Sequence, residues 1–165
     1  MNRVAANPPK VLLRSEDSGG HVAIVELPGG GHPPLHHHDF DEAFYLLEGE
    51  LTFQLGDDVF TRRAGEVAFA PRGLPHTYAN LSGAAARALL VITPAGFERY
   101  FDRIAARITG TEPPPEAAKP IPEVITVGPP LGPESIPSAE EPRGVGDEAP
   151  VRTNRSRRAE VEEGE

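Results

Sequence analysis

Between residues 11 and 93 the sequence is divided into short segments rich in branched and aromatic residues, each bounded by glycine, proline or aspartate. This spacing predicts β-strands joined by turns. The predicted strands cover residues 11–14, 21–27, 42–47, 50–55, 59–62, 67–70, 76–81 and 87–93. Strands at this spacing are typical of a sandwich or a barrel, and a closed barrel has an interior that can hold one small ligand. The fold class is therefore predicted to be all-β.

The first stretch whose side chains could bind a ligand or take part in a reaction spans residues 30–49. In a strand, residues two apart point to the same face, so His36 and His38 share a face and His37 points to the opposite one. Glu42 lies four residues beyond His38, an even step, and stays on that face if the strand continues. His36, His38 and Glu42 are thus candidates for a common site.

The second stretch spans residues 65–80 and contains Gly65, Pro71, Gly73, His76 and Asn80. Gly65 is placed where a hairpin needs a positive φ or a close backbone approach, and Pro71 with Gly73 marks a turn that delivers His76. Asn80 is predicted to secure a turn through hydrogen bonds to the backbone.

Together the two stretches resemble the two motifs of the cupin superfamily, G-x5-H-x-H-x3-E-x6-G and G-x5-P-x-G-x2-H-x3-N, and 15 residues separate them. The resemblance covers roughly residues 10–108 and points to the small single-domain cupins of the quercetin-dioxygenase-like type. It implies a double-stranded β-helix, or jelly-roll barrel, with a metal bound inside by His36, His38, Glu42 and His76. Cupins range from dioxygenases and isomerases to sugar-binding and storage proteins, so the fold alone names no reaction.

Three imidazole nitrogens and one carboxylate oxygen suit iron, manganese, nickel, copper or zinc better than calcium or magnesium. We therefore expect one divalent transition metal per chain. Four protein ligands leave an open position on a five- or six-coordinate ion, as a catalytic site requires. Glu42, if it loosened from the metal, could act as a base on an acidic substrate hydroxyl. His37 and His32 are not predicted as ligands, and His32 is expected at the rim of the pocket.

The inward positions near these ligands predict an apolar or aromatic pocket. The candidate lining residues are Phe40, Phe44, Phe53, Phe69 and Tyr78. Whether Phe53 or Phe69 faces inward depends on strand pairing, and Tyr78 and Tyr45 could form hydrogen bonds with a ligand. Ordinary barrel core is the commoner role for any single one of them. As a set they favour an apolar or aromatic ligand over a sugar phosphate, and Arg72 is the only basic residue in the two motifs apart from the histidines.

Residues after the last strand show a helical period. Phe97, Phe101, Ile104 and Ile108 are spaced by four, three and four residues, which predicts an amphipathic helix over 97–108 that ends near Gly110. Such a stripe most often packs on the outside of the barrel, at its mouth, or against a second subunit. The first domain is therefore predicted to span residues 1–110, with its motif core at 30–80.

Residues 111–165 contain eleven prolines and no aromatic residue. Low hydrophobicity with high charge cannot offset the entropy lost on ordering, so this acidic tail is predicted to be mostly disordered. One alternative stays open: residues 124–133 could dock on the barrel as an extended arm.

The net charge of −9 disfavours binding to the phosphate backbone of nucleic acids. The chain has no cysteine, which excludes disulfides and thiolate ligands. The N-terminus lacks the apolar core of a signal peptide, and no run is long enough to span a membrane, so a cytoplasmic location is expected. Because cupins commonly dimerise, the resemblance also implies a homodimer.

Three functions remain in order of preference. The first is a metal-dependent oxygenase that acts on a small organic substrate, aromatic compounds included. The second is a non-redox metalloenzyme, such as an isomerase, cyclase or lyase. The third is a non-catalytic module that binds a small molecule. A fused DNA-binding domain would favour sensing, but the sequence before the barrel is too short for a helix-turn-helix.

Overall fold

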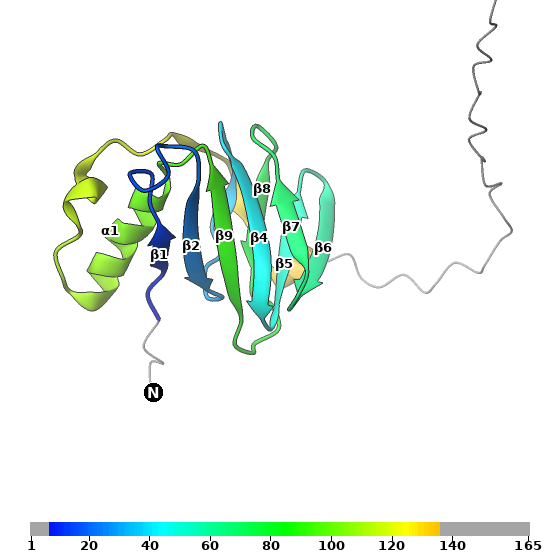
Figure 1. Cartoon of the computed structure of the whole chain (residues 1–165). Coiled ribbons are helices and arrows are strands. Elements are labelled where there is room, and N and C mark those ends of the chain that lie inside the picture. The colour runs from blue at the N-terminus through cyan, green and yellow to red at the C-terminus, as the bar shows by residue number, and fades with distance from the viewer. Residues whose placement is uncertain (1–6, 136–165) are drawn as a thin grey trace, which may run out of the picture.

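The computed structural model of the chain describes residues 7–135, and these form two five-stranded antiparallel sheets that face each other (Figure 1). The first sheet has the strand order β1 (Lys10–Leu13), β2 (Ala23–Pro28), β9 (Arg87–Thr93), β4 (Asp41–Glu48), β7 (Val67–Ala70). The second has the order β10 (Val124–Pro130), β3 (Pro34–His38), β8 (His76–Ala79), β5 (Glu50–Leu55), β6 (Asp58–Arg63). This is the predicted all-β jelly roll, and the predicted strands are present with ends that differ by at most two residues.

The core lies between the sheets and follows the two-residue period of the strands. In β9 the side chains of Ala88, Leu90 and Ile92 are buried, whereas the intervening ones are partly exposed. Their partners in β2 are Leu27, Val25 and Ala23, which are also buried. Phe44 of β4 and Phe53 of β5 join the two sheets, with ring centroids 5.3 Å apart. Each such buried large apolar side chain contributes roughly 1.5–3 kcal/mol to folding.

The tight turn between β4 and β5 depends on Gly49. Its φ is +68°, and a Cβ atom there would lie 2.2 Å from the carbonyl oxygen of Ala85. Only glycine fits a backbone approach this close at a positive φ. The turn sets the register of the β4–β5 connection, and β4 carries Glu42.

The predicted helix is present as α1 (Glu98–Thr109), and it packs against β1 and β2. It ends at Gly110, which has a φ of +71° and donates its N–H to the carbonyl of Ala106. Its polar face is fastened to the loop after β1 by two acidic side chains. The buried Glu98 accepts a hydrogen bond from the Ser15 N–H at 2.9 Å, and Asp102 forms an ion pair with Arg14. None of the helices within residues 7–135 has the length and apolar character needed to cross a bilayer.

Part of the tail is folded onto the barrel, and in Figure 1 it runs on from α1 past the first sheet. It contains the 3-10 turns η1 (Pro115–Ala118) and η2 (Pro133–Ser135) on either side of β10. β10 pairs with β3 in the register Val124–His38, Ile125–His37 and Thr126–His36. The docked arm, left open by the sequence, is therefore confirmed, and the second sheet includes a strand from beyond residue 110. The disorder predicted for the rest of the tail falls on residues 136–165, outside the described residues.

Candidate metal centre

Four side chains from both sheets meet at one point inside the barrel. His36 and His38 lie on β3, His76 lies opposite His36 on β8, and Glu42 lies on β4 of the other sheet. Their potential ligand atoms all lie within 4.8 Å of one another. The set that the cupin resemblance implies is thus brought together.

The route by which Glu42 reaches this point differs from the expectation. β3 ends at His38 and β4 begins at Asp41 in the opposite sheet, so the strand does not continue from His38 to Glu42. The even spacing does not place Glu42 on the same strand face. Instead the chain turns at residues 39–40, and Glu42 points back at the imidazoles from across the core.

Each histidine of the cluster is oriented by a hydrogen bond from its Nδ1 to a backbone carbonyl. The acceptors are Pro34 for His36 at 2.7 Å, Phe40 for His38 at 2.8 Å and Leu74 for His76 at 2.8 Å. A carbonyl oxygen can only accept, so each Nδ1 carries the hydrogen and each neutral ring presents the lone pair of Nε2. Three ring nitrogens are therefore prepared to coordinate an ion, as in metal sites with backbone-oriented histidines.

One of these nitrogens lacks a hydrogen-bond partner. Nε2 of His38 is fully buried and, among the described residues, has no hydrogen bond, although Oε2 of Glu42 lies 3.4 Å away. A buried polar atom without a partner is costly unless an ion or a water molecule satisfies it. The stacking of Phe40 on the His38 ring, with centroids 3.5 Å apart and planes 3° apart, holds this nitrogen in place.

Charges within the cluster are strongly coupled. Burial alone would raise the pKa of Glu42, but the hydrogen bond with His76 and the close approach of the His38 ring outweigh it and lower that pKa to about 2. Burial alone would lower the pKa of His76, but its hydrogen bond to Glu42, 3.2 Å long, and the charge of that carboxylate raise it. Burial lowers the pKa of His36. Without a metal, the Glu42 carboxylate therefore favours the protonated form of His76 more than an ordinary surrounding would.

The donor set fits a divalent transition metal. Three neutral nitrogens, one of them buried without a partner, and one carboxylate oxygen are what such an ion binds, and few oxygens are present for calcium or magnesium. His36, His38, Glu42 and His76 would hold the ion. A set of this kind accepts several transition metals, so geometry and availability choose among them.

A cavity of about 890 Å³ opens beside the cluster, and His36, Glu42 and His76 form part of its lining. Its other walls are mostly apolar. The barrel contributes Leu27, Phe44, Tyr78 and Leu90, and α1 contributes Tyr100, Phe101, Ile104 and Ile108, with Phe97 just before it. All four residues of the predicted helical stripe line this cavity, so the apolar side of the helix faces the cavity.

The structure separates the predicted pocket residues. Phe44 and Tyr78 line the cavity, whereas Phe40 and Phe53 are buried around it, Phe40 against His38. Phe69 was expected to face inward, and this is wrong, because its side chain is 53% exposed. β7 pairs with β4 so that Ala70 lies opposite the inward Glu42, which puts the adjacent Phe69 on the outer face.

The two tyrosines considered as hydrogen-bonding groups also differ. Tyr45 is 42% exposed on the outer face of β4 and cannot reach the cavity. Tyr78 packs its ring 5.3 Å from that of Phe44 and lines the cavity. Burial and the charge of Glu42 raise the pKa of Tyr78, so its hydroxyl keeps its proton and can donate to a ligand.

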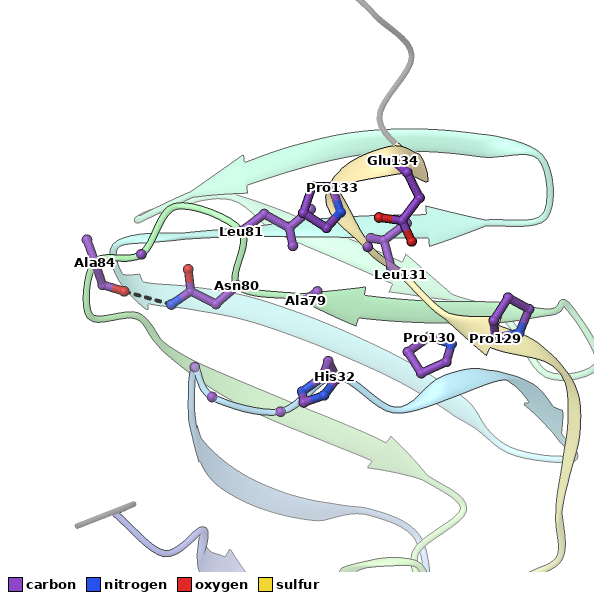
Figure 2. A pocket seen from close by; sticks show the side chains of 15 residues that line it. His32, Ala79, Asn80, Leu81, Ala84, Pro129, Pro130, Leu131, Pro133 and Glu134 are labelled. Carbon is purple, nitrogen blue, oxygen red and sulfur yellow. Dashed lines mark hydrogen bonds between the residues drawn. The ribbon is translucent and has the colours of Figure 1, made fainter. Parts of the chain in front are cut away.

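The remaining histidines of the first stretch lie outside the cluster, as predicted. His37 points away from it, opposite Ile125 of β10. His32 is among the residues that line the cavity, and it also lines a second hollow of about 640 Å³. Figure 2 shows this hollow between the end of β8 and the tail, where Leu131 and Pro133 lie near Leu81.

Asn80 closes the turn beside this second hollow. Its Nδ2 donates to the carbonyl of Ala84 at 2.7 Å (Figure 2). Its Oδ1 accepts from the N–H of Ser82 at 3.1 Å. Its predicted role in a turn is confirmed.

Sequence reasoning did not identify the part of the tail that reaches the cavity. Ile121, Pro122, Val124 and Thr126 line it, and Ile121 also packs against the barrel core. The proline-rich composition of this segment concealed its role, and its only local signal was the short run of branched residues at 124–127.

Comparison with known proteins finds a cupin-like region within the chain. Residues 23–92 match the family model described as a cupin domain. This match spans β2 to β9 and includes all four residues of the cluster, but it excludes β1, α1 and the tail. No curated protein shows significant similarity to the chain.

Several solved structures are similar to part of the chain. The protein TT1209 from Thermus thermophilus is 29% identical, with 52% of this chain and 81% of that chain covered and a TM-score of 0.45. The polyketide cyclase RemF from Streptomyces resistomycificus is 26% identical over 56% of this chain and 79% of that chain, with a TM-score of 0.46. The EutQ protein of Clostridium difficile is 21% identical over 55% and 64%, with a TM-score of 0.46. These scores are too low to carry a function from those proteins to this chain.

Proposed function

We propose that this protein is a metal-dependent oxygenase that acts on a small organic substrate with an apolar, often aromatic, body. The observation that supports it most is the orphaned Nε2 of His38, which lies within a His3Glu cluster beside a large apolar cavity. Because the cluster opens onto the cavity, a bound ion would have a position free for a substrate oxygen.

The residues of the chain have distinct roles in this proposal. His36, His38 and His76 hold the ion through Nε2, and Phe40 keeps the His38 ring in place. When bound, the ion would polarise a substrate oxygen and, if redox-active, allow chemistry with dioxygen. Glu42 has a pKa of about 2 in the metal-free site, so it takes a proton only from an acidic hydroxyl made more acidic by its surroundings. The Tyr78 hydroxyl donates a hydrogen bond that orients the substrate.

Oxygen uptake tests this function. The full chain is loaded anaerobically with Fe(II), Mn(II), Ni(II), Cu(II) or Zn(II) and then offered phenols, flavonols and diketones in an oxygen electrode. We expect uptake with at least one redox-active metal and none with zinc or with Glu42→Gln. Absence of uptake with every metal and substrate would rule out the oxygenase.

A non-redox metalloenzyme is the second candidate, because the donor set suits Zn(II) as well as a redox-active ion. Turnover by the zinc-loaded protein in the absence of oxygen would identify it. Ligand binding without turnover under either condition would identify a binding module.

We also infer that the protein forms a homodimer in the cytoplasm, on the basis of the cupin resemblance and the composition. On the same basis we infer that it contacts neither nucleic acid nor membrane. Size-exclusion chromatography with light scattering tests the dimer.

A further inference from the structure

We propose that four tail residues, Ile121, Pro122, Val124 and Thr126, form a selectivity wall that makes the cavity accept a ligand with an extended, uncharged apolar body. This tail wall lies outside the residues that match the cupin domain. The inference rests on the proposed function in one respect: a metal in the cluster holds the oxygen atoms of the ligand at the opposite end of the cavity.

The register of β10 points the wall into the cavity. Val124 lies opposite His38 and Thr126 lies opposite His36. In an antiparallel pair, residues directly opposite each other project to the same side of the sheet. The two tail side chains therefore extend the face that carries the imidazoles, whereas Ile125, opposite His37, projects to the other side.

The segment before β10 is held by arginines of α1. Arg103 donates to the carbonyls of Ala117 at 2.8 Å and Lys119 at 3.0 Å, and Arg99 donates to the carbonyl of Pro120 at 3.2 Å. These bonds grip the backbone immediately before Ile121, which also packs against the barrel core. Ile121 is thus held at a defined place before any ligand binds, and this lowers the entropy cost of binding.

The chemistry of the lining defines the class of ligand. Within the described part of the chain, no lysine or arginine lines the cavity, so an anionic group far from the metal would be buried without a counter-charge. The wall and α1 instead offer branched aliphatic and aromatic side chains. The cavity therefore suits a molecule whose oxygen atoms meet the metal and whose uncharged apolar body reaches the tail.

Two chelators that differ only in this body test the proposal. Maltol and 3-hydroxyflavone both bind metals through a hydroxyl and a neighbouring keto oxygen, but only the flavone has a large aromatic body. Binding is measured by absorbance and fluorescence titration of the zinc-loaded full chain, because zinc does no redox chemistry. Metal content is measured on the same samples.

The variants are Ile121→Ala and Val124→Ala, with Ile125→Ala as a matched control on the other side of the strand. We expect each wall variant to bind 3-hydroxyflavone roughly tenfold more weakly, from the loss of buried methyl groups. Their maltol affinity and zinc content should equal those of the wild type, and Ile125→Ala should change nothing. Ile121→Leu, which keeps the volume, should restore most of the affinity.

Unchanged binding of 3-hydroxyflavone by both wall variants would overturn the proposal, as would an equal loss of maltol binding at full zinc content. Flavone itself, which lacks the chelating hydroxyl, separates this inference from the proposed function. If the wild type binds neither zinc nor any of the redox-active metals, the proposed function fails. The wall is then tested on the metal-free protein, where Ile121→Ala should still weaken flavone binding, and equal flavone affinity would contradict the wall.

Discussion

The floor of the cavity is built by β3, β4 and β8, whereas its outer wall is built by α1 and the tail, which lie outside the cupin match. In the floor, three imidazoles are oriented by carbonyls two residues away, and all four residues of the cluster are at most 9% exposed. In the wall, the tail is held by arginine bonds to its carbonyls, and the side chain of Val124 is 36% exposed.

The difference indicates that the floor and the wall serve different functions. A floor positioned by short-range bonds and deep burial tolerates little change without losing its chemistry. A wall attached by longer side chains at the surface can vary in shape while the floor stays intact. Metal binding and ligand selection should therefore respond to different mutations, and the following predictions test that separation from the largest effect to the smallest.

The largest effect is expected from His36→Ala, with His37→Ala as its control. His36 points into the cluster and its neighbour points away, so only the first change removes a ligand. We expect metal content to fall from near one ion per chain to a small fraction, with affinity lowered by about 100-fold or more. Elemental analysis of purified protein measures it. Full occupancy in His36→Ala and His76→Ala would refute the site.

The next effect is a pH dependence of metal binding. In the metal-free protein the raised pKa of His76 stabilises the folded state below about pH 6.5. This stabilisation is lost as the pH rises through the raised pKa. The lowered pKa of Glu42 stabilises the folded state above about pH 4.5. This stabilisation is lost as the pH falls toward 2. The pair therefore stabilises the metal-free protein most between these limits, and a metal competes with a proton for His76.

We consequently expect metal affinity to increase as pH rises from about 6 to about 8, with protons released on metal binding at the lower end of this range. Competition with a coloured chelator and pH measurement in weakly buffered solution detect the two effects. Glu42→Gln removes the carboxylate that raises the pKa of His76, so it should release fewer protons. Equal proton release by this variant would contradict the coupling.

A smaller effect is expected from Tyr78→Phe, which removes one hydroxyl at the boundary between floor and wall. Loss of a hydrogen bond to a ligand should weaken 3-hydroxyflavone binding by about 5- to 10-fold, while metal content stays constant. Tyr45→Phe removes a hydroxyl from the outer face and serves as the control. Equal affinity of the two variants would remove Tyr78 from the proposed mechanism.

The smallest effect is expected from Arg103→Gln, which weakens the attachment of the tail. The lost bonds join a charged side chain to carbonyls near the surface, so stability should fall by about 1 kcal/mol or less. Affinity for 3-hydroxyflavone should decrease by roughly two- to threefold through greater freedom of Ile121. Chemical denaturation and the same titration measure these changes. A loss of metal in this variant would show that floor and wall are not independent.

Much of the floor could be predicted because its signals are local. Alternation along β3 separated His36 and His38 from His37, and glycine and proline turns marked the strand ends. The helical stripe likewise predicted which side of α1 faces the cavity. Phe69 was misplaced because its direction depends on the register between β7 and β4, which spacing within either strand does not reveal.

The resemblance to cupins, and not periodicity, brought Glu42 and His76 into the candidate cluster. By itself, the amino-acid sequence placed His36 and His38 on one strand face, located the strands and the helix, and excluded cysteine chemistry. These properties follow from residue type and from periods of two or 3.6 residues along one segment. Only the tertiary structure decided that Glu42 arrives from the opposite sheet, that Phe69 faces outward and that a proline-rich tail walls the cavity. Each of these depends on pairing between segments far apart in the chain, a choice made by the packing of the whole barrel.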